Sequence, residues 1–273
     1  MSPIEQSIKQ KIESVGTPLK DWDINIYRGV LTGCNEAFIV STEKRDEILA
    51  NCKTEEERKK TAELIRPILR GRDIKRYGYN WANLWLIYIP WHFPLQFDNS
   101  ITGASEKAEK AFKEQYPAVY AHMLQFKEPL SKRNKAETGI RYEWYAMQRW
   151  GANYWDLFFQ PHICWKAVGR KLAFALVEGG TFLTAPASFI SAGKYNNLIL
   201  TYLCSNVGTY FIYKNSDTTG AGDIMLNIQS LIKFPVPIAD TEISTLTDED
   251  KEHFVYTSYG FTKDEILYIE SQI

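Results

Sequence analysis

The stretch LIRPILRGRDIKRYGYN, residues 64–80, decides how the middle of the chain folds. It follows a strongly charged segment, residues 43–65, that is predicted to be helical. Pro67 interrupts that helix because proline has no amide hydrogen to donate. The stretch sets one acid, Asp73, against five basic residues (Arg66, Arg70, Arg72, Lys75 and Arg76). It is therefore either a solvated turn or one edge of a surface that binds an anion.

Outward from this stretch, helical and strand-like segments alternate. Residues 4–15 place four apolar side chains on one helical stripe, and Gly16-Thr17-Pro18 ends that helix. Residues 105–131 form a long helical stretch in which Pro117 stands near the start of the second half, where a missing N–H is tolerated. Strands are expected at 24–40, as two strands around a turn at 32–35, and at 84–89, 162–165, 172–177, 180–185 and 188–192, with an extended segment at 234–239.

The C-terminal part of the chain is predicted to end in two helices. Thr247 can cap the first, and Thr262 the second, where Glu265 three residues later completes a capping box. Residues 197–213 are apolar and either helical or strand-like.

Charge is distributed unevenly over the 273 residues, whose formal net charge is −1. Residues 240–273 hold nine acids and two lysines, a balance of −7, which leaves +6 for residues 1–239. A basic body with an acidic tail is typical of proteins with a nucleic-acid partner, although a solvated helical face gives the same count. No apolar run is long enough to span a bilayer, so no membrane partner is expected.

The polar N-terminus and the cysteines point to a cytoplasmic protein. MSPIEQSIKQKIES lacks the apolar region of a signal peptide. The four cysteines are scattered and form no CxxC pair, so neither a zinc site nor a disulfide framework is expected.

Catalytic motifs are missing from the sequence. The histidines have no HExxH spacing, and no GxSxG, GxxxxGK[ST] or GxGxxG pattern occurs. Active sites also assemble in space from distant residues, so this absence lowers the expectation of an enzyme without excluding one.

Binding of DNA fits the basic clusters better. Lysine and arginine neutralise phosphates, and they gather here at residues 66–76, 132–135 and 166–171. Neighbouring aromatic side chains could stack on bases or simply fill the core (Tyr77, Tyr79, Tyr142 and Trp144).

Taken together, the ordered segments resemble the C-terminal target-recognition, or specificity, domain of TaqI-like adenine-specific DNA methyltransferases, which also occurs in type IIG restriction-modification enzymes. The similarity runs in the family's order through GTPLKDWDINIYRGVLTGCNEAFIV (16–40), ELIRPILRGRDIKRY (63–77), LWLIYIP (84–90), YPAVYAHMLQFKEPLSKR (116–133), RYEWYAM (141–147), FFQPHICW (158–165), YLCSNVGTYFI (202–212), FPVPIA (234–239) and YGFTKDEILYIE (259–270). His162 departs from the family's usual lysine, and Cys204-Ser205-Asn206 departs from its L-N-S sequence.

The resemblance implies an α+β fold, with a twisted, β-helix-like body of short strands and a C-terminal helical pair. It also implies a bacterial, cytoplasmic specificity part that is not an enzyme by itself and needs no cofactor. Double-stranded DNA would be one partner and an adenine-methyltransferase catalytic domain, fused upstream or separate, the other; that domain would use S-adenosylmethionine. Residues 1–18 would then be a connector helix from an upstream catalytic domain, 19–239 the target-recognition domain, and 240–273 an acidic helical segment.

Two sets of residues are candidates for DNA contact under this interpretation. Backbone phosphates are assigned to seven basic residues: Arg70, Arg72, Lys75, Arg76, Lys132, Arg133 and Lys135. Weaker candidates for reading bases are Arg141, Gln148, Arg149 and Asn153. Gly33 and Gly71 are expected to serve backbone geometry, and Asp73 to pair with a neighbouring arginine. No catalytic or metal-binding residue is assigned.

Two alternatives remain at the level of the sequence. One is a stand-alone nuclease whose carboxylate site is assembled in space. The other is a protein-interaction domain whose basic patches meet an acidic partner.

Overall fold

A computed structural model describes residues 1–273, and it is an elongated molecule with two hydrophobic cores. The first core lies in the half of the molecule that contains α2–α7, and the second lies in the half that contains α1 and α8–α12. We call these halves the first and the second lobe.

A four-stranded antiparallel sheet separates the two cores. Its order is β10-β8-β12-β2, and we call it the central sheet: β2 (Ile26–Arg28), β8 (His162–Trp165), β10 (Phe174–Val177) and β12 (Ser188–Ile190). Successive side chains of a strand point to opposite faces. In β8, Cys164 accordingly joins the first core, whereas Ile163 and Trp165 join the second. A strand covered on both faces is buried throughout, as β8 is.

The first lobe is built on a second four-stranded sheet, of order β11-β4-β7-β3. Its strands are β3 (Ile39–Ser41), β4 (Ile65–Leu69), β7 (Leu84–Ile87) and β11 (Phe182–Leu183). Around it lie α2 (Asn35–Phe38), α3 (Thr42–Ala50), α4 (Glu55–Leu64), α5 (Glu106–Gln115), α6 (Pro117–Leu124) and α7 (Lys127–Ser131). Pro117 is the first residue of α6, as expected for a proline tolerated at a helix start.

The prediction that Pro67 interrupts a helix is wrong. Helix α4 already ends at Leu64, and Pro67 lies inside strand β4, opposite Trp85 of β7. Strand β11 pairs on the other side only from Ile68 onward. The proline is therefore placed next to the point where double-sided pairing begins.

The predicted turn between two strands at residues 32–35 is also wrong. Strand β2 belongs to the central sheet and β3 to the first-lobe sheet, so the two never pair. Between them the chain forms the short helix α2, and Thr32 donates its hydroxyl hydrogen to Asn35 over 2.6 Å. This segment crosses from one lobe to the other.

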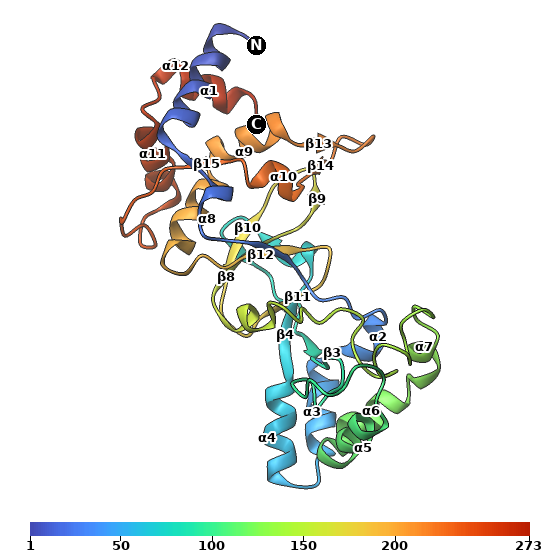
Figure 1. The fold of residues 1–273 in the computed structure, drawn as a ribbon. Coiled ribbons are helices and arrows are strands. Elements are labelled where there is room, and N and C mark those ends of the chain that lie inside the picture. The colour runs from blue at the N-terminus through green and yellow to red at the C-terminus, as the bar shows by residue number, and fades with distance from the viewer.

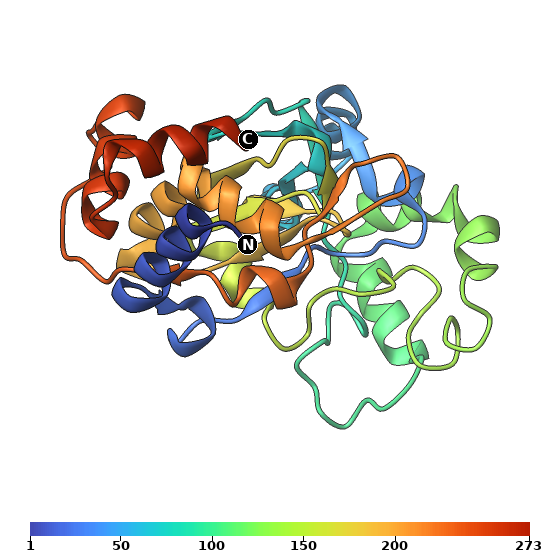
Figure 2. The same cartoon turned by 90° about the horizontal axis from the view of Figure 1, so that it is seen from above.

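The second lobe is mainly helical. It contains α1 (Pro3–Val15), α8 (Asn196–Cys204), α9 (Asn206–Asn215), α10 (Ile228–Leu231), α11 (Asp248–Tyr259) and α12 (Lys263–Ser271). Thr247 caps α11 and Thr262 caps α12, with the predicted capping box to Glu265. Residues 197–213 are thus helical. Figure 2, seen from above, shows α1 beside the helices of the C-terminal half.

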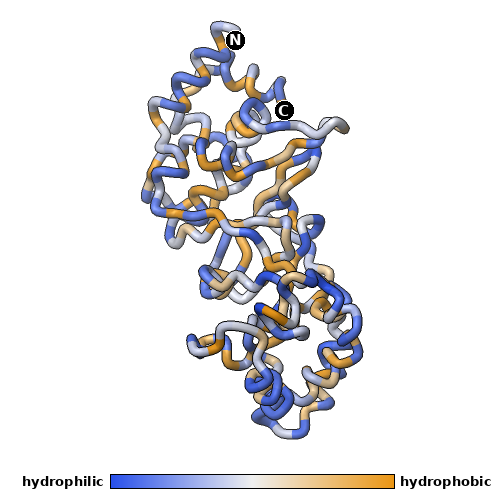
Figure 3. The backbone as a smooth tube through the Cα atoms, turned by 45° about the vertical axis from the view of Figure 1, so that its right-hand side comes forward, coloured by the Kyte–Doolittle hydropathy of each residue, from blue (hydrophilic) through white to orange (hydrophobic).

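Short elements complete the fold. They are the pair β1 (Thr17–Pro18) and β15 (Pro235–Val236), the sheet of β9 (Val168–Gly169), β13 (Asp217–Thr218) and β14 (Ile224–Met225), the hairpin β5 (Ile74–Lys75) and β6 (Gly78–Tyr79), and four 3₁₀ helices, η1 (Leu19–Asp21), η2 (Gly71–Asp73), η3 (Trp155–Phe159) and η4 (Gly193–Tyr195). The α+β fold class is confirmed, with several small sheets, no barrel and a C-terminal helical pair. In Figure 3 hydrophobic positions follow the strands in the middle of the molecule, and the tip of the first lobe is hydrophilic.

Candidate nucleic-acid interface

The stretch 64–80 divides its basic side chains between the interior and the surface. Asp73 is buried and accepts hydrogen bonds from the backbone N–H, Nε and Nη2 of Arg70, at 2.7–3.0 Å. Burial alone would raise the pKa of Asp73, but these bonds outweigh it and lower that pKa. The predicted pairing of Asp73 with an arginine is confirmed, and Arg70 is held in place by it. Arg72 and Lys75 remain exposed.

Arg76 connects the stretch 64–80 to helices of the second lobe through hydrogen bonds. Its Nε donates to the Cys204 carbonyl, and its two terminal nitrogens bind Asp248 and Glu252, each bond 3.0 Å long. These partners come from α8 and α11, far along the chain. These bonds use three of the five guanidinium hydrogens, so Arg76 is held against α8 and α11, and its contact with a phosphate stays a prediction.

The predicted contact between Arg133 and a DNA phosphate conflicts with the structure, because the side chain of Arg133 is buried. Its guanidinium donates to four backbone carbonyls, those of Leu130, Thr32, Trp144 and Ala146, over 2.6–3.0 Å. Burial lowers the pKa of this arginine. Arg133 cannot reach a phosphate; it ties the loop after α7 to the segment that crosses between the lobes.

The two lysines beside it are exposed. Lys132 pairs with Glu128 at 2.6 Å on the surface of α7, where both side chains are solvated. Lys135 is exposed and has no ion-pair partner. Both are placed where an anion could approach, and their contact with DNA stays a prediction.

Two of the four base-reading candidates line one cavity, and a third is linked to them. Arg149 and Asn153 line a hollow of about 310 Å³ together with Arg28, Leu31 and Trp91. Arg141 joins them through Glu137, which it binds at 2.8 Å. Gln148 does not line the cavity but lies against Gly33. A Cβ atom added to Gly33 would lie 2.6 Å from the Gln148 amide oxygen, and the backbone φ of Gly33 is +74°. Gly33 therefore serves backbone geometry, as expected.

Sequence reasoning missed three residues of this cavity region: Arg28, Trp91 and Glu137. Arg28 follows strand-like residues but is not part of a basic cluster. Trp91 resembles any aromatic residue of a core. Glu137 is acidic, and only the fold shows that it collects arginines.

Two basic groups lie at the same end of the central sheet. Arg28, the last residue of β2, pairs with Ser188, and Ser188 pairs with Trp165, which Lys166 follows. Two interstrand spacings separate the backbones of β2 and β8 by roughly 10 Å. Lys166 lies against Gly71, with 3.0 Å between its Cβ and an ideal Cβ on that glycine, so the Gly71 turn joins the same region. This sheet end, where Arg28, Arg149 and Lys166 lie near the basic Gly71 turn, is the candidate interface.

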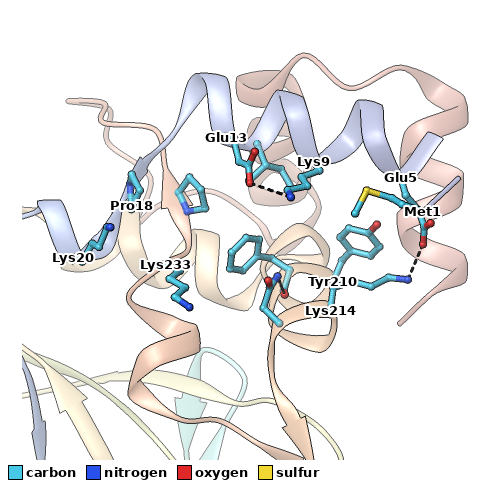
Figure 4. A pocket seen from close by; sticks show the side chains of 13 residues that line it. Met1, Glu5, Lys9, Glu13, Pro18, Lys20, Tyr210, Lys214 and Lys233 are labelled. Carbon is cyan, nitrogen blue, oxygen red and sulfur yellow. Dashed lines mark hydrogen bonds and ion pairs between the residues drawn. The ribbon is translucent and has the colours of Figure 1, made fainter. Parts of the chain in front are cut away.

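A larger cavity, of about 660 Å³, lies elsewhere. Figure 4 shows it between α1 and α9, where Lys9 pairs with Glu13 and Lys214 with Glu5. Lys20 and Lys233 at its edge are exposed and have no ion-pair partner. This cavity shares no residue with the sheet-end hollow.

Other kinds of site find little support among the side chains. No group of three or more His, Cys, Asp or Glu side chains is arranged to hold a metal ion. None of the helices combines the length and the apolar character that crossing a bilayer requires.

Comparison with known proteins gives a family and a group of similar solved structures, of which two are described. A model of the TaqI-like C-terminal specificity domain matches residues 66–236. No curated protein matches the chain. The type IIL restriction-modification enzyme MmeI, solved in complex with DNA, is 12% identical with a TM-score of 0.55, over 93% of this chain and 36% of that one. The type IIG restriction endonuclease BpuSI is 11% identical with a TM-score of 0.50, over 94% and 28%. The chain thus spans about a third of these enzymes, which share its fold.

Proposed function

Since this chain belongs to the family of TaqI-like C-terminal specificity domains, we propose that it selects the target sequence in double-stranded DNA for a restriction-modification enzyme. The observation that carries the proposal is the end of the central sheet, where Arg28 and Arg149 line a hollow with an exposed amide and an exposed apolar side chain, Asn153 and Leu31. Such a surface offers both kinds of contact that DNA recognition needs, cations for phosphates and polar groups for base edges.

The division of labour within the surface follows from what each side chain is already bound to. Arg72, Lys75 and Lys135 are exposed and are proposed to hold phosphates, with Arg70 and Lys132 as paired contributors. Arg141, Arg149 and Asn153 are proposed to face the bases. One good bidentate contact discriminates by about 1–3 kcal/mol, so several are required to select a site.

The chemistry is proposed to reside in another part of the enzyme, an adenine-specific methyltransferase domain that binds S-adenosylmethionine. The support is the resemblance to TaqI-like enzymes and the small share of MmeI and BpuSI that this chain matches. A methyltransferase must take its base out of the duplex, and a separate domain could hold the flanking duplex in register while it does so. Acting on cellular DNA in this way, the protein is proposed to be cytoplasmic and bacterial.

The test is binding of the full chain to labelled duplexes at several salt concentrations, followed by fluorescence anisotropy. About four phosphate contacts give a log–log slope near −3.6, so affinity should fall on the order of 100-fold between about 50 and 200 mM salt. In parallel, selection from a library of randomised duplexes should enrich one motif. Binding that ignores salt, or enrichment of no motif by the chain combined with its methyltransferase part, would overturn the proposal.

A further inference from the structure

One buried carboxylate in the loop after α7 holds two exposed arginines. Glu137 accepts hydrogen bonds from Nη1 of Arg141 at 2.8 Å and from Nη1 and Nη2 of Arg149 at 2.9 and 3.2 Å. The amide of Asn134 donates to the same carboxylate at 2.6 Å. The pKa of Glu137 is lowered, mainly by its hydrogen bonds from Arg149, so the carboxylate is charged at neutral pH. Both arginines are thereby fixed near their tips.

The ring of Trp91 contributes to the same fixation. The guanidinium carbons of Arg141 and Arg149 lie 5.4 and 5.9 Å from its centre, within the range of a cation–π contact. Trp91 itself cannot turn freely, because its indole N–H donates to the Met147 carbonyl at 2.9 Å and its ring stacks on Tyr142 at 4.7 Å. The arginines therefore meet a ligand with little conformational entropy left to lose.

Counting the donors of Arg149 shows which edge of it is free. Nη1 uses its two hydrogens on Glu137 and on the Gln148 carbonyl, and Nη2 uses one on Glu137. The Nε hydrogen and the second Nη2 hydrogen have no partner in the protein, and about half of the side chain is exposed. These two hydrogens are parallel and lie on one edge of the planar group, which is the fork that matches O6 and N7 of guanine.

The surroundings of this free edge suit the major groove rather than a phosphate alone. Leu31 lies opposite Arg149 in an antiparallel bridge and is exposed, so it offers an apolar contact beside the fork. Arg28 and Asn153 line the same hollow. An oriented fork also matches a phosphate, so the apolar neighbour is the feature that favours base reading, because an apolar side chain beside the fork can contact a thymine methyl group.

We propose that Arg149 reads a guanine in the target sequence through its free Nε–Nη2 edge, and that Glu137 is the positioning residue that fixes this edge. The inference rests on the proposed function and goes beyond it by naming the base. Arg141, with only one nitrogen bound to Glu137, is the more mobile partner of the pair.

The experiment is sequence selection from randomised duplexes with the wild-type protein, carrying its methyltransferase part, and with variants. The wild type should enrich a motif that contains at least one guanine. Arg149→Ala should lose the preference at one guanine position by about 5- to 150-fold, which corresponds to one bidentate contact, while the other positions persist. Lys135→Ala is the matched control, since it should weaken binding to all sequences equally.

Glu137→Gln separates positioning from folding. It keeps a hydrogen-bonding side chain but removes the charge, so the same guanine preference should weaken, and Glu137→Asp should restore part of it. Thermal melting of each variant shows that the fold is retained. If the wild type enriches a motif and Arg149→Ala enriches the same motif with every guanine intact, Arg149 is no reader; if the wild type enriches nothing, the proposed function fails instead.

Discussion

A single side chain, Arg133, shows how far a residue's role depends on its surroundings. In the sequence it is one of four polar residues in a basic run, Lys132-Arg133-Asn134-Lys135, and such runs are usually solvated. In the structure its guanidinium is enclosed by four carbonyls, three of which lie more than ten residues away along the chain. The sequence carries no local signal for this, because burial is decided by segments that only folding brings together.

Replacement of Arg133 should therefore destabilise the protein rather than weaken a DNA contact. Arg133→Ala leaves several buried carbonyls without a donor, and we expect a loss of roughly 3–5 kcal/mol in the free energy of unfolding. Lys132→Ala, which removes an exposed ion pair, should cost less than about 1 kcal/mol. Urea denaturation followed by circular dichroism measures both. Equal losses in the two variants would contradict the role assigned to Arg133.

His162 predicts a pH dependence of stability. It is fully buried at the start of β8, its Nδ1–H donates to the Gln160 carbonyl at 2.7 Å, and its Nε2 has no partner. Burial lowers its pKa to about 4, from 6.5. As the pH falls below 6.5 the unfolded chain takes up a proton that the folded chain refuses. Stability from this group is therefore intact above pH 6.5 and declines toward pH 4, by up to about 3 kcal/mol.

The measurement compares how steeply the free energy of unfolding changes with pH in each protein, rather than its absolute value. His162→Gln should flatten the fall in unfolding free energy between pH 6.5 and 4, whatever its effect at pH 7. His253→Gln, at an exposed position of α11, should keep the wild-type slope. Identical slopes in all three proteins would show that the buried imidazole does not govern this range. The buried His122, whose pKa burial also lowers, contributes to the slope common to all three.

At the scale of elements, the sequence predicted what is decided locally. The capping box at Thr262 and the proline at the start of α6 are confirmed, because a few neighbouring residues determine each. Strand β8 is also where the apolar run placed it. Strand partners were not predictable: residues 24–40 contain two strands, but each pairs in a different sheet with segments far away.

The contact between β5 and the C-terminal helices depends on Arg76. Its three hydrogen bonds reach Cys204, Asp248 and Glu252, so it connects α8 and α11 to the stretch 64–80. Arg76→Ala should lower the free energy of unfolding by about 1–2 kcal/mol, a moderate value because the side chain is partly solvated. Lys75→Ala, next to it and exposed, should leave stability within about 0.5 kcal/mol of the wild type. A chemical denaturation curve for each variant distinguishes the two residues.

Over the whole molecule, the acidic tail is not a separate negatively charged segment, because some of its acids bind basic and polar side chains of the body. Part of the tail's charge is used inside the fold, where Glu265 binds Lys11 at 2.7 Å and Ser7 at 2.6 Å and so fastens α1 to α12. Burial alone would raise the pKa of Glu265, but these bonds outweigh it and lower that pKa to about 2. The distribution of net charge along the sequence therefore indicates a kind of partner without showing where it binds. The position of each cation in the fold determines whether it is free to bind that partner.

Two variants with the same change in net charge test that distinction. Arg72→Ala/Lys75→Ala removes two exposed cations beside the sheet-end interface, and Lys20→Ala/Lys233→Ala removes two exposed cations at the cavity between α1 and α9. If location matters, the first pair should reduce the log–log salt slope of DNA binding by about 1.8, whereas the second should leave it nearly unchanged. Anisotropy titrations at four salt concentrations give the slopes. If both double variants flatten the slope equally, the protein attracts DNA through its overall charge, and the proposal that the sheet end is the contact surface is wrong.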